Sequence, residues 1–599
     1  MQSRKPNHTW FLGLGLLLLL TACAQQDIDS NKPEETQSAA LTTPAADAEV
    51  APPPTPAVLA EQRRKLPEKI RQKTGIQLFS AAKLHHPPGI VRTITQDVQE
   101  RYPDFENNGV FWTAQDPVST FAVDVDSAAY ANMRRQLQLG RLPNPDSVRV
   151  EELINYFSYD YPVPTDREQP FSVYTEMGPS PWDGGEGGSG RKLVHIGIKG
   201  WADDQQNLPP ANLVFLIDTS GSMQAANKLG LFKSAAKMLV NQLRPQDRVA
   251  IVVYAGSAGQ VLAPTSGAQR ATIMHAIDNL RAGGSTNGSA GIDLAYQLAR
   301  QNFQEAATNR VILATDGDFN VGTTDIEALK RKVEQERASG VALTVLGFGT
   351  GNYNDHLMQE LAQIGNGNAA YIDTITEARK VLVEELGATL HIIAKDMKVQ
   401  VEFNPQVVES YRLIGYETRH LNREDFSNDR VDAGDVGAGH TVTALYEVTL
   451  TGDGNTDSLR YTHAQPAAQT TAFDGEVAFI KLRYKQPDQS RSRLVSQPLY
   501  RADMQGQLHN TSKIFRFSSA VAWLGQALRN NAQVPQADLT PLIELAQGAR
   551  GADPHGYRHE FLNLARTAQA LQTPLANVTD PRRSEHNSDV RRVTKAGGR

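Results

Sequence analysis

The sequence predicts a multidomain α/β protein in which a Rossmann-like, doubly wound domain with a mostly parallel sheet is inserted into a β-sandwich-like domain. The first observation is the length, because 599 residues exceed what one hydrophobic core supports. The second is an alternation of apolar strand patterns and amphipathic helix patterns over residues 211–393, which is typical of a parallel sheet covered by helices. The third is an apolar period of two that begins at Val399 and predicts a β layer.

Strand patterns that precede the alternating region predict the insertion. The stretches 171–174 and 193–198 read as strands and need partners in a sheet, which the later β layer can supply. We therefore expect residues 166–205 and 396–500 to be the two parts of one β-sandwich. Residues 206–395 would then form the inserted domain.

The segments on either side complete the predicted organisation. Residues 59–165 read as a small α/β or α+β region, in which Asp126 and Ser127 are interpreted as a helix cap rather than as a second metal loop. Two apolar helical stripes predict a C-terminal helical region over 501–575. The polar residues 576–599 are expected to form a disordered tail.

The first 22 residues have the pattern of a secretory signal. Arg4 and Lys5 precede an apolar stretch that ends in the leucine run 16–20 and is too short for a comfortable membrane span. The run closes with Leu-Thr-Ala-Cys, which resembles the lipobox of bacterial lipoproteins. This resemblance implies a lipoprotein signal peptide over residues 1–22 and lipidation of Cys23.

The residues after the lipobox predict a lipid-anchored protein of the cell envelope. Ala24 follows the cysteine, and its resemblance to the sorting rule of Gram-negative lipoproteins implies the outer membrane, facing the periplasm. Residues 23–58 are rich in Ala, Pro and Thr without an aromatic residue, so they are expected to be a disordered tether. Cys23 is the single cysteine, which excludes disulfides within the chain and thiolate metal sites. A net charge of −6 offers no basic excess for nucleic acid.

Polar side chains at the ends of two buried strand patterns predict a metal site. Asp218, Ser220 and Ser222 follow the first of these strands, and Asp316 follows the second. Thr286 offers a further hydroxyl from a glycine-rich segment between them. Because open α/β sheets bind ligands at the carboxyl ends of their strands, these groups are expected at one edge. Hard oxygen ligands of this kind suit Mg²⁺.

These three segments resemble the metal-ion-dependent adhesion site (MIDAS) of von Willebrand factor type A (VWA) domains. The resemblance implies a first loop with Asp218, Ser220 and Ser222, a second with Thr286 and a third with Asp316. The competing interpretation, a helix cap at Asp218 and an ordinary loop hydroxyl at Thr286, leaves the second strand-end aspartate unexplained.

The order of segments along the whole chain after the tether also carries a resemblance. Residues 123–132 and 314–320, together with the β and helical segments that follow, are similar to those of bacterial VWA-domain lipoproteins of the YfbK type. This resemblance implies a fold and a metal site but little about the biological role.

The function that these residues favour is metal-dependent protein recognition without catalysis. Neutral hydroxyls leave Mg²⁺ or Mn²⁺ under-neutralised, so an Asp or Glu of a protein partner can complete its coordination. One alternative is a structural envelope module whose metal only stabilises loops. Another is a metal-dependent hydrolase, but the sequence has no G-x-S-x-G, and His559-Glu560 lacks the second histidine of a zinc protease.

Overall fold

The computed structural model describes Tyr102 and much of the chain from 105 to 572. The gaps within that range are 124–125, 166–167, 184–189, 203–207, 256, 285–287, 318–325, 350–353, 386–389, 432, 454–472, 474, 488 and 537. All described residues belong to one compact unit, residues 94–599. The predicted signal peptide, the lipidation site at Cys23, the tether and the C-terminal tail therefore lie outside the described residues.

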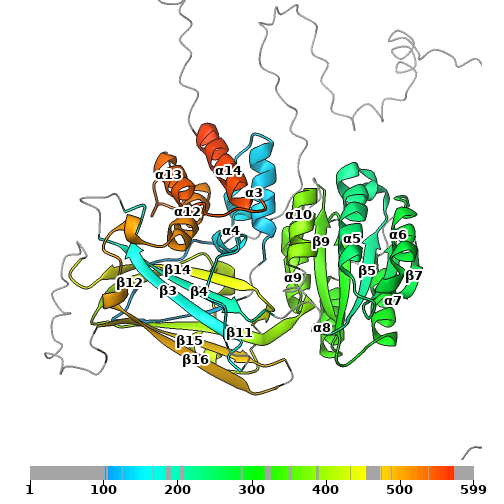
Figure 1. Ribbon diagram of the computed structural model, residues 1–599, viewed down its shortest axis with the longest axis horizontal. Helices are drawn as coiled ribbons and strands as arrows, with labels where there is room; N and C mark the ends of the chain where they lie inside the picture. The colour runs from blue at the N-terminus through cyan, green and yellow to red at the C-terminus, as the bar shows by residue number, and fades with distance from the viewer. Residues whose placement is uncertain are drawn as a thin grey trace, which may run out of the picture. The chain divides into compact units, whose positions relative to one another are not determined.

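A six-stranded sheet forms the centre of the inserted domain (Figure 1), in the order β10-β9-β8-β5-β6-β7. Its strands are β5 (Ala211–Asp218), β6 (Arg248–Tyr254), β7 (Ala258–Ser266), β8 (Thr308–Thr315), β9 (Ala342–Phe348) and β10 (Ala369–Ile372). Neighbouring strands are parallel except for the edge strand β7, which is antiparallel to β6. Every residue of β5 is buried, as expected for a central strand covered on both faces.

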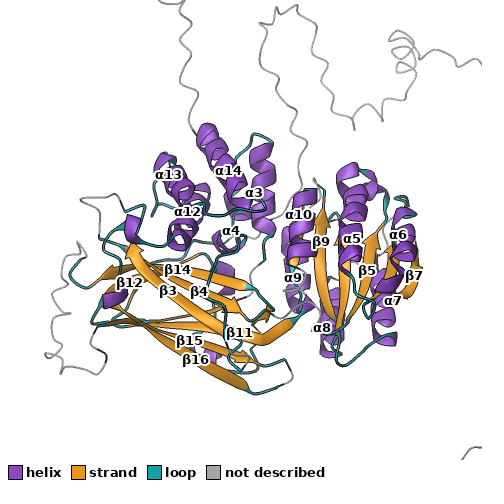
Figure 2. Cartoon of the chain, in the orientation of Figure 1, coloured by secondary structure: helices purple, strands orange, loops and turns teal. Residues whose placement is uncertain are grey.

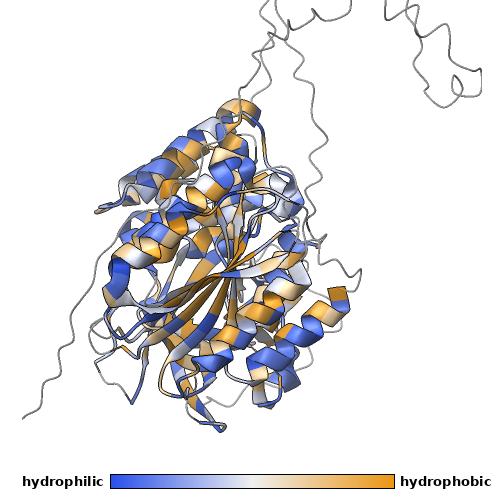
Figure 3. Cartoon of the chain, turned by 90° about the vertical axis from the view of Figure 1, so that its right-hand side faces the viewer, coloured by the Kyte–Doolittle hydropathy of each residue, from blue (hydrophilic) through white to orange (hydrophobic). Residues whose placement is uncertain are grey.

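Helices cover both faces of this sheet, so the doubly wound arrangement is confirmed (Figure 3). One face packs Val214 and Leu216 of β5 against α7 (Gly288–Gln301), α8 (Ile326–Ala338) and α9 (Asp355–Ile364). The other packs Leu213 and Phe215 against α5 (Leu231–Gln242), α6 (Arg270–Asp278) and α10 (Ile375–Arg379), which continues as the π turn η6 (Lys380–Glu384). Successive residues of β5 thus point to opposite cores, as in any strand.

Two antiparallel sheets form the predicted sandwich (Figure 2), and they share one core. The first has the order β1-β12-β14-β4-β3, and the second has β13-β11-β15-β16, with β2 also paired to β11. The strands are β1 (Phe111–Trp112), β2 (Val118–Ala122), β3 (Phe171–Pro179), β4 (Lys192–Gly200), β11 (Ile392–Phe403), β12 (Val408–Ile414), β13 (Gly434–Gly437), β14 (Thr441–Leu450), β15 (Glu476–Lys485) and β16 (Ser492–Tyr500). Since β4 pairs with β14 and the VWA-like sheet lies between them in the chain, the inserted arrangement is confirmed.

Five helices share a separate core with the outer face of the first sandwich sheet. They are α3 (Ala128–Gln138), α4 (Val150–Asn155), α12 (Lys513–Leu528), α13 (Thr540–Ala549) and α14 (Tyr557–Gln572). Leu193 of β4 and Leu445 of β14 belong to this core. None of the described helices is long and apolar enough to cross a membrane.

Residues 105–165 differ from the expectation of a small region of their own. They supply β1 and β2 to the two sandwich sheets and α3 and α4 to the helical layer. Local sequence patterns could not show which distant segments these elements join. The predicted domain boundaries themselves stay predictions.

Asp126 is not the helix cap that the sequence suggested. Ser127 occupies the N-cap position of α3, but its side chain makes no capping hydrogen bond. The Asp126 carboxylate instead accepts hydrogen bonds from the backbone N–H of Ala369, at 2.8 Å, and from Arg419, at 3.2 Å. It therefore joins the start of α3 to a strand of the parallel sheet and to the sandwich.

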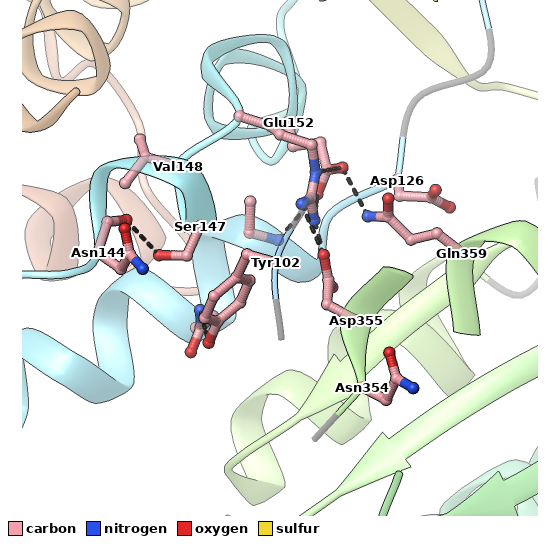
Figure 4. Close-up of polar contacts among 12 residues, drawn as sticks. Tyr102, Asp126, Asn144, Ser147, Val148, Glu152, Asn354, Asp355 and Gln359 are labelled. Carbon is pink, nitrogen blue, oxygen red and sulfur yellow. Dashed lines mark hydrogen bonds and ion pairs between the residues drawn. The ribbon is translucent and has the colours of Figure 1, made fainter. Parts of the chain in front are cut away.

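A buried ion-pair cluster makes a second joint to the inserted domain (Figure 4). Arg149, at the N-cap of α4, donates to Asp355 of α9, with 2.6 Å between Nη1 and Oδ2, and its Nε pairs with Glu152. Gln359 of α9 donates to Glu152 at 3.1 Å. The side chains of Arg149, Glu152 and Asp355 are each 2% exposed, so these charges stabilise the fold only as a set.

Candidate metal-binding site

The backbone after β5 is held between two neighbouring segments. The N–H of Thr219 donates to the carbonyl of Tyr254, the last residue of β6, at 3.0 Å. Gly221 donates to Gly284 at 3.1 Å, and Gly283 donates to Thr219 at 2.8 Å. The first predicted metal loop is therefore joined directly to the glycine-rich segment that carries the second.

The Asp218 carboxylate ends β5 and is fully buried. Its Oδ1 accepts a hydrogen bond from the backbone N–H of Ser220 at 2.8 Å, which orders the loop. Its Oδ2 is also buried, and no described residue gives it a hydrogen bond of ordinary geometry. A buried, unsatisfied carboxylate oxygen is costly, and a bound cation would satisfy it.

Burial raises the pKa of Asp218 to about 6, since the charged form loses its hydration. Hydrogen bonds from Ser220 and the nearby hydroxyl of Tyr254 lower this pKa, and the nearby carboxylate of Asp316 raises it. The surroundings of this group therefore disfavour its negative charge, which a divalent cation would compensate.

Two serine hydroxyls lie beside this carboxylate in the sequence. The Oγ atoms of Ser220 and Ser222 are 2.8 Å apart, with Ser220 buried and Ser222 partly exposed. Two neutral oxygens from one short loop can thus point to a common position. Together with the carboxylates they form an all-oxygen donor set, which fits Mg²⁺ or Mn²⁺ better than a soft metal.

Asp316 follows β8, the parallel neighbour of β5, and is likewise buried. Its carboxylate influences the pKa of Asp218, so the two acids share one site at the carboxyl edge of the sheet. The structure thus brings Asp218, Ser220, Ser222 and Asp316 to one edge. Thr286 lies outside the described residues, and its role as a ligand stays a prediction.

Sequence reasoning missed one charged residue of this site, Lys228. Its Nζ donates to Oδ2 of Asp316 at 2.8 Å, and the residue is only 8% exposed. The sequence contained a sign that Lys228 is buried. This lysine stands four residues before Phe232 and so extends the apolar stripe of α5. A lysine in line with a buried stripe indicates either a snorkelling side chain or a buried ion pair.

The comparisons with protein families agree with this geometry. Residues 212–384 match the von Willebrand factor type A domain. Residues 96–188 match a family described as von Willebrand factor, and residues 388–571 match the C-terminal part of the uncharacterized protein YfbK. The fold and the matches therefore define a VWA-domain protein.

The relatives narrow this class further. Uncharacterized protein YfbK of Escherichia coli (strain K12) is 45% identical over 479 residues, which are 79% of this chain and 81% of that protein. The chain belongs to the YfbK family. Uncharacterized protein sll0103 of Synechocystis is 28% identical over 316 residues, which are 52% of this chain and 70% of that protein. A solved structure of a von Willebrand factor type A protein from Catenulispora acidiphila covers 70% of this chain and 98% of its own at 13% identity, with a TM-score of 0.37.

Proposed function

We propose that this protein binds a protein partner through a divalent metal at the edge of its VWA sheet. Asp218, Ser220, Ser222, Thr286 and Asp316 would hold the ion, with Mg²⁺ or Mn²⁺ as the natural choice for oxygen donors. The observation that carries the proposal is the buried Oδ2 of Asp218, to which no described residue donates a hydrogen bond of standard geometry.

The charges of the proposed metal ligands also indicate which chemical group the partner would supply. Three of the five proposed ligands are neutral hydroxyls, so the protein contributes only two carboxylates against a double positive charge. When bound, the metal would offer a position that attracts a further anionic oxygen. A carboxylate from an Asp or Glu of the partner would supply that negative charge.

The lipobox-like sequence around Cys23 supports a location for this binding in the cell envelope. Acyl chains on Cys23 would anchor the chain to the outer membrane, and the tether up to residue 58 would let the folded part reach partners away from the lipid surface. The partner is thus sought among envelope proteins. A structural module whose metal only ties loops together is the second candidate, and a hydrolase is the third.

The test is a capture experiment from envelope extract with the full chain as bait, in Mg²⁺ and in EDTA. A partner that is retained in Mg²⁺, is released by EDTA and fails to bind Asp218→Ala supports the proposal. Asp278→Ala is the matched control, because Asp278 ends α6 of the same domain and is exposed. Binding that survives EDTA and Ser220→Ala would assign recognition to another surface.

The carboxylate is tested on the recovered partner. Replacing its critical Asp by Asn, or Glu by Gln, keeps the shape but removes the charge, so binding should be lost. If no single replacement of this kind matters, the metal does not receive a carboxylate from that partner.

A further inference from the structure

The ion pair between Lys228 and Asp316 adds a positive charge to the candidate metal site. Nζ of Lys228 lies 2.8 Å from Oδ2 of Asp316, and the side chains are 10% and 0% exposed. Because both groups are withdrawn from water, their interaction is screened far less than that of a surface pair. The site therefore contains one positively charged side chain in addition to its two carboxylates.

The lysine is held in this position by the local backbone. It belongs to a π turn, η4 (Ala226–Gly230), which precedes α5 directly. Single turns of this wider kind are frequent at functional sites. The wider turn places Lys228 on the side of the helix that faces the end of β8.

Gly349 makes the room that the lysine stem needs. A Cβ at this position would lie 2.4 Å from both Cγ and Cε of Lys228, and the glycine has a φ of +82°. The stem thus packs directly on the backbone that follows β9. A side chain packed in this way has little freedom to leave when a ligand binds at the opposite oxygen of Asp316.

We propose that Lys228 is a built-in counter-charge that weakens the binding of the metal and strengthens the binding of a carboxylate to that metal. The inference rests on the proposed function and deepens it by naming the residue that divides the binding free energy between the two ligands. With the lysine in place, the donor groups carry a net charge of −1 instead of −2. The bound ion would then keep more of its positive charge for the partner.

The same charge has a role before any metal binds. Asp218 and Asp316 follow neighbouring parallel strands and lie buried at the same edge of the sheet, so their negative charges repel each other. Lys228 pairs with Asp316 and so reduces this repulsion when no metal is bound. Removing the lysine charge should lower the stability of the metal-free protein. It should also increase the stability that the protein gains when metal binds.

The decisive variant is Lys228→Met, which keeps the length of the side chain and removes its charge. The matched control is Lys237→Met in α5, on the same side of the sheet, where the lysine is half-buried and pairs with Asp278. Lys228→Arg keeps the charge and serves as the conservative variant. All four full-length proteins are compared in mild detergent.

The first measurement is calorimetric titration with Mn²⁺ and Mg²⁺. We expect Lys228→Met to bind the metal about tenfold more tightly than wild type, because a nearby positive charge has been removed. Lys237→Met should equal wild type, and Lys228→Arg should remain within about threefold of it.

The second measurement is the affinity of the Mn²⁺-loaded proteins for acetate, followed by water-proton relaxation. Acetate stands in for the partner's carboxylate and displaces water from the ion. We expect Lys228→Met to bind acetate several-fold more weakly than wild type, although it binds the metal more tightly. A residue that only stabilised the fold would not change the two affinities in opposite directions.

The outcomes separate the two proposals. If wild type binds neither metal, both fail. If wild type binds metal and Lys228→Met binds it with the same or lower affinity, the metal site stands and the role of Lys228 is refuted. Should Lys228→Met fail to fold, Lys228→Gln, which can still donate a hydrogen bond to Asp316, carries the same expectations.

Discussion

Arg149 and Asp355 form a buried ion pair that joins helix α4 to the first turn of helix α9, with 2.6 Å between Nη1 and Oδ2. The same guanidinium also pairs with Glu152, so one arginine contacts two carboxylates that are withdrawn from water. The inserted domain is thereby fixed to the helical layer by charge, in addition to its apolar contacts.

Breaking this cluster should be costly. Asp355→Asn is expected to lower the free energy of unfolding by about 3 kcal/mol, because one member of a buried pair is lost. Arg149→Met should cost more, since it leaves both Glu152 and Asp355 without their cation. Thermal unfolding followed by circular dichroism measures this. Equal stability of wild type and Arg149→Met would show that the cluster is hydrated in solution.

Metal should stabilise the folded chain. A ligand at 100 times its dissociation constant adds about 2.7 kcal/mol if it binds only the native state, so saturating Mg²⁺ or Mn²⁺ should raise the melting temperature by several degrees. Asp218→Ala should abolish the rise, and Asp316→Ala should reduce it. Differential scanning fluorimetry with and without EDTA measures this shift in the melting temperature. The site assignment fails if Asp218→Ala responds to Mg²⁺ as wild type does.

Lipidation should depend on one residue. Cys23→Ser removes the only thiol of the chain, so it should yield an unprocessed or soluble protein instead of one in the outer-membrane fraction. Globomycin should likewise cause the wild-type precursor to accumulate. Membrane fractionation and mass spectrometry check both results. Continued fractionation of Cys23→Ser with the outer membrane would contradict the anchor.

His195 should make the fold sensitive to acid. Burial lowers the pKa of its imidazole from 6.5 to about 3, and its ring nitrogens lie 2.8 Å from the Tyr161 hydroxyl and 3.1 Å from the Ser518 hydroxyl. The unfolded chain binds the proton below pH 6.5 and the folded chain does not, so stability is present above that pH and falls with acid. The slope for this group is about 1.4 kcal/mol per pH unit.

The measurement that checks this is the pH dependence of the unfolding free energy of wild type compared with that of His195→Gln. His195→Gln keeps polar atoms near Tyr161 and Ser518 but cannot titrate, so its unfolding free energy should fall less steeply between pH 6.5 and 4. Other buried acids, such as Glu151, titrate in both proteins and cancel in the difference. Parallel pH profiles for the two proteins would mean that the native imidazole is protonated in this range.

The elements that the sequence predicted are those with the strongest burial. Residues 213–217 and 311–314 are continuous apolar runs because their strands are covered on both faces. Such runs can be recognised in the sequence without knowing which strands pair. The edge strand β7 was missed, since Gly259 and Pro264 weaken its pattern and much of it is partly exposed. The short helices α6 and α13 were missed as well.

The candidate metal site likewise contains residues that the sequence predicted and one that it did not. Loop spacing was sufficient to predict Asp218, Ser220, Ser222 and Asp316 at one edge, because parallel strands end together. It could not predict Lys228, whose role depends on a π turn and on the space above Gly349. Asp126 was misjudged for a related reason. Its partners, Ala369 and Arg419, come from segments more distant in the chain than any local motif can show.

Both ends of the inserted domain are held by one residue. Thr308, the first residue of β8, donates its backbone N–H to Pro210 at 2.9 Å, and its hydroxyl donates to Leu390. Once the insertion has folded, the chain that leaves the sandwich at Gly200 therefore returns close to its point of departure. Bringing the ends of an unfolded loop of this length together would cost about 5 kcal/mol of chain entropy. Formation of the parallel sheet removes that cost in advance, so the pairing of β4 with β14 should follow it in time, and a lesion that slows folding of the insertion should delay the whole sandwich.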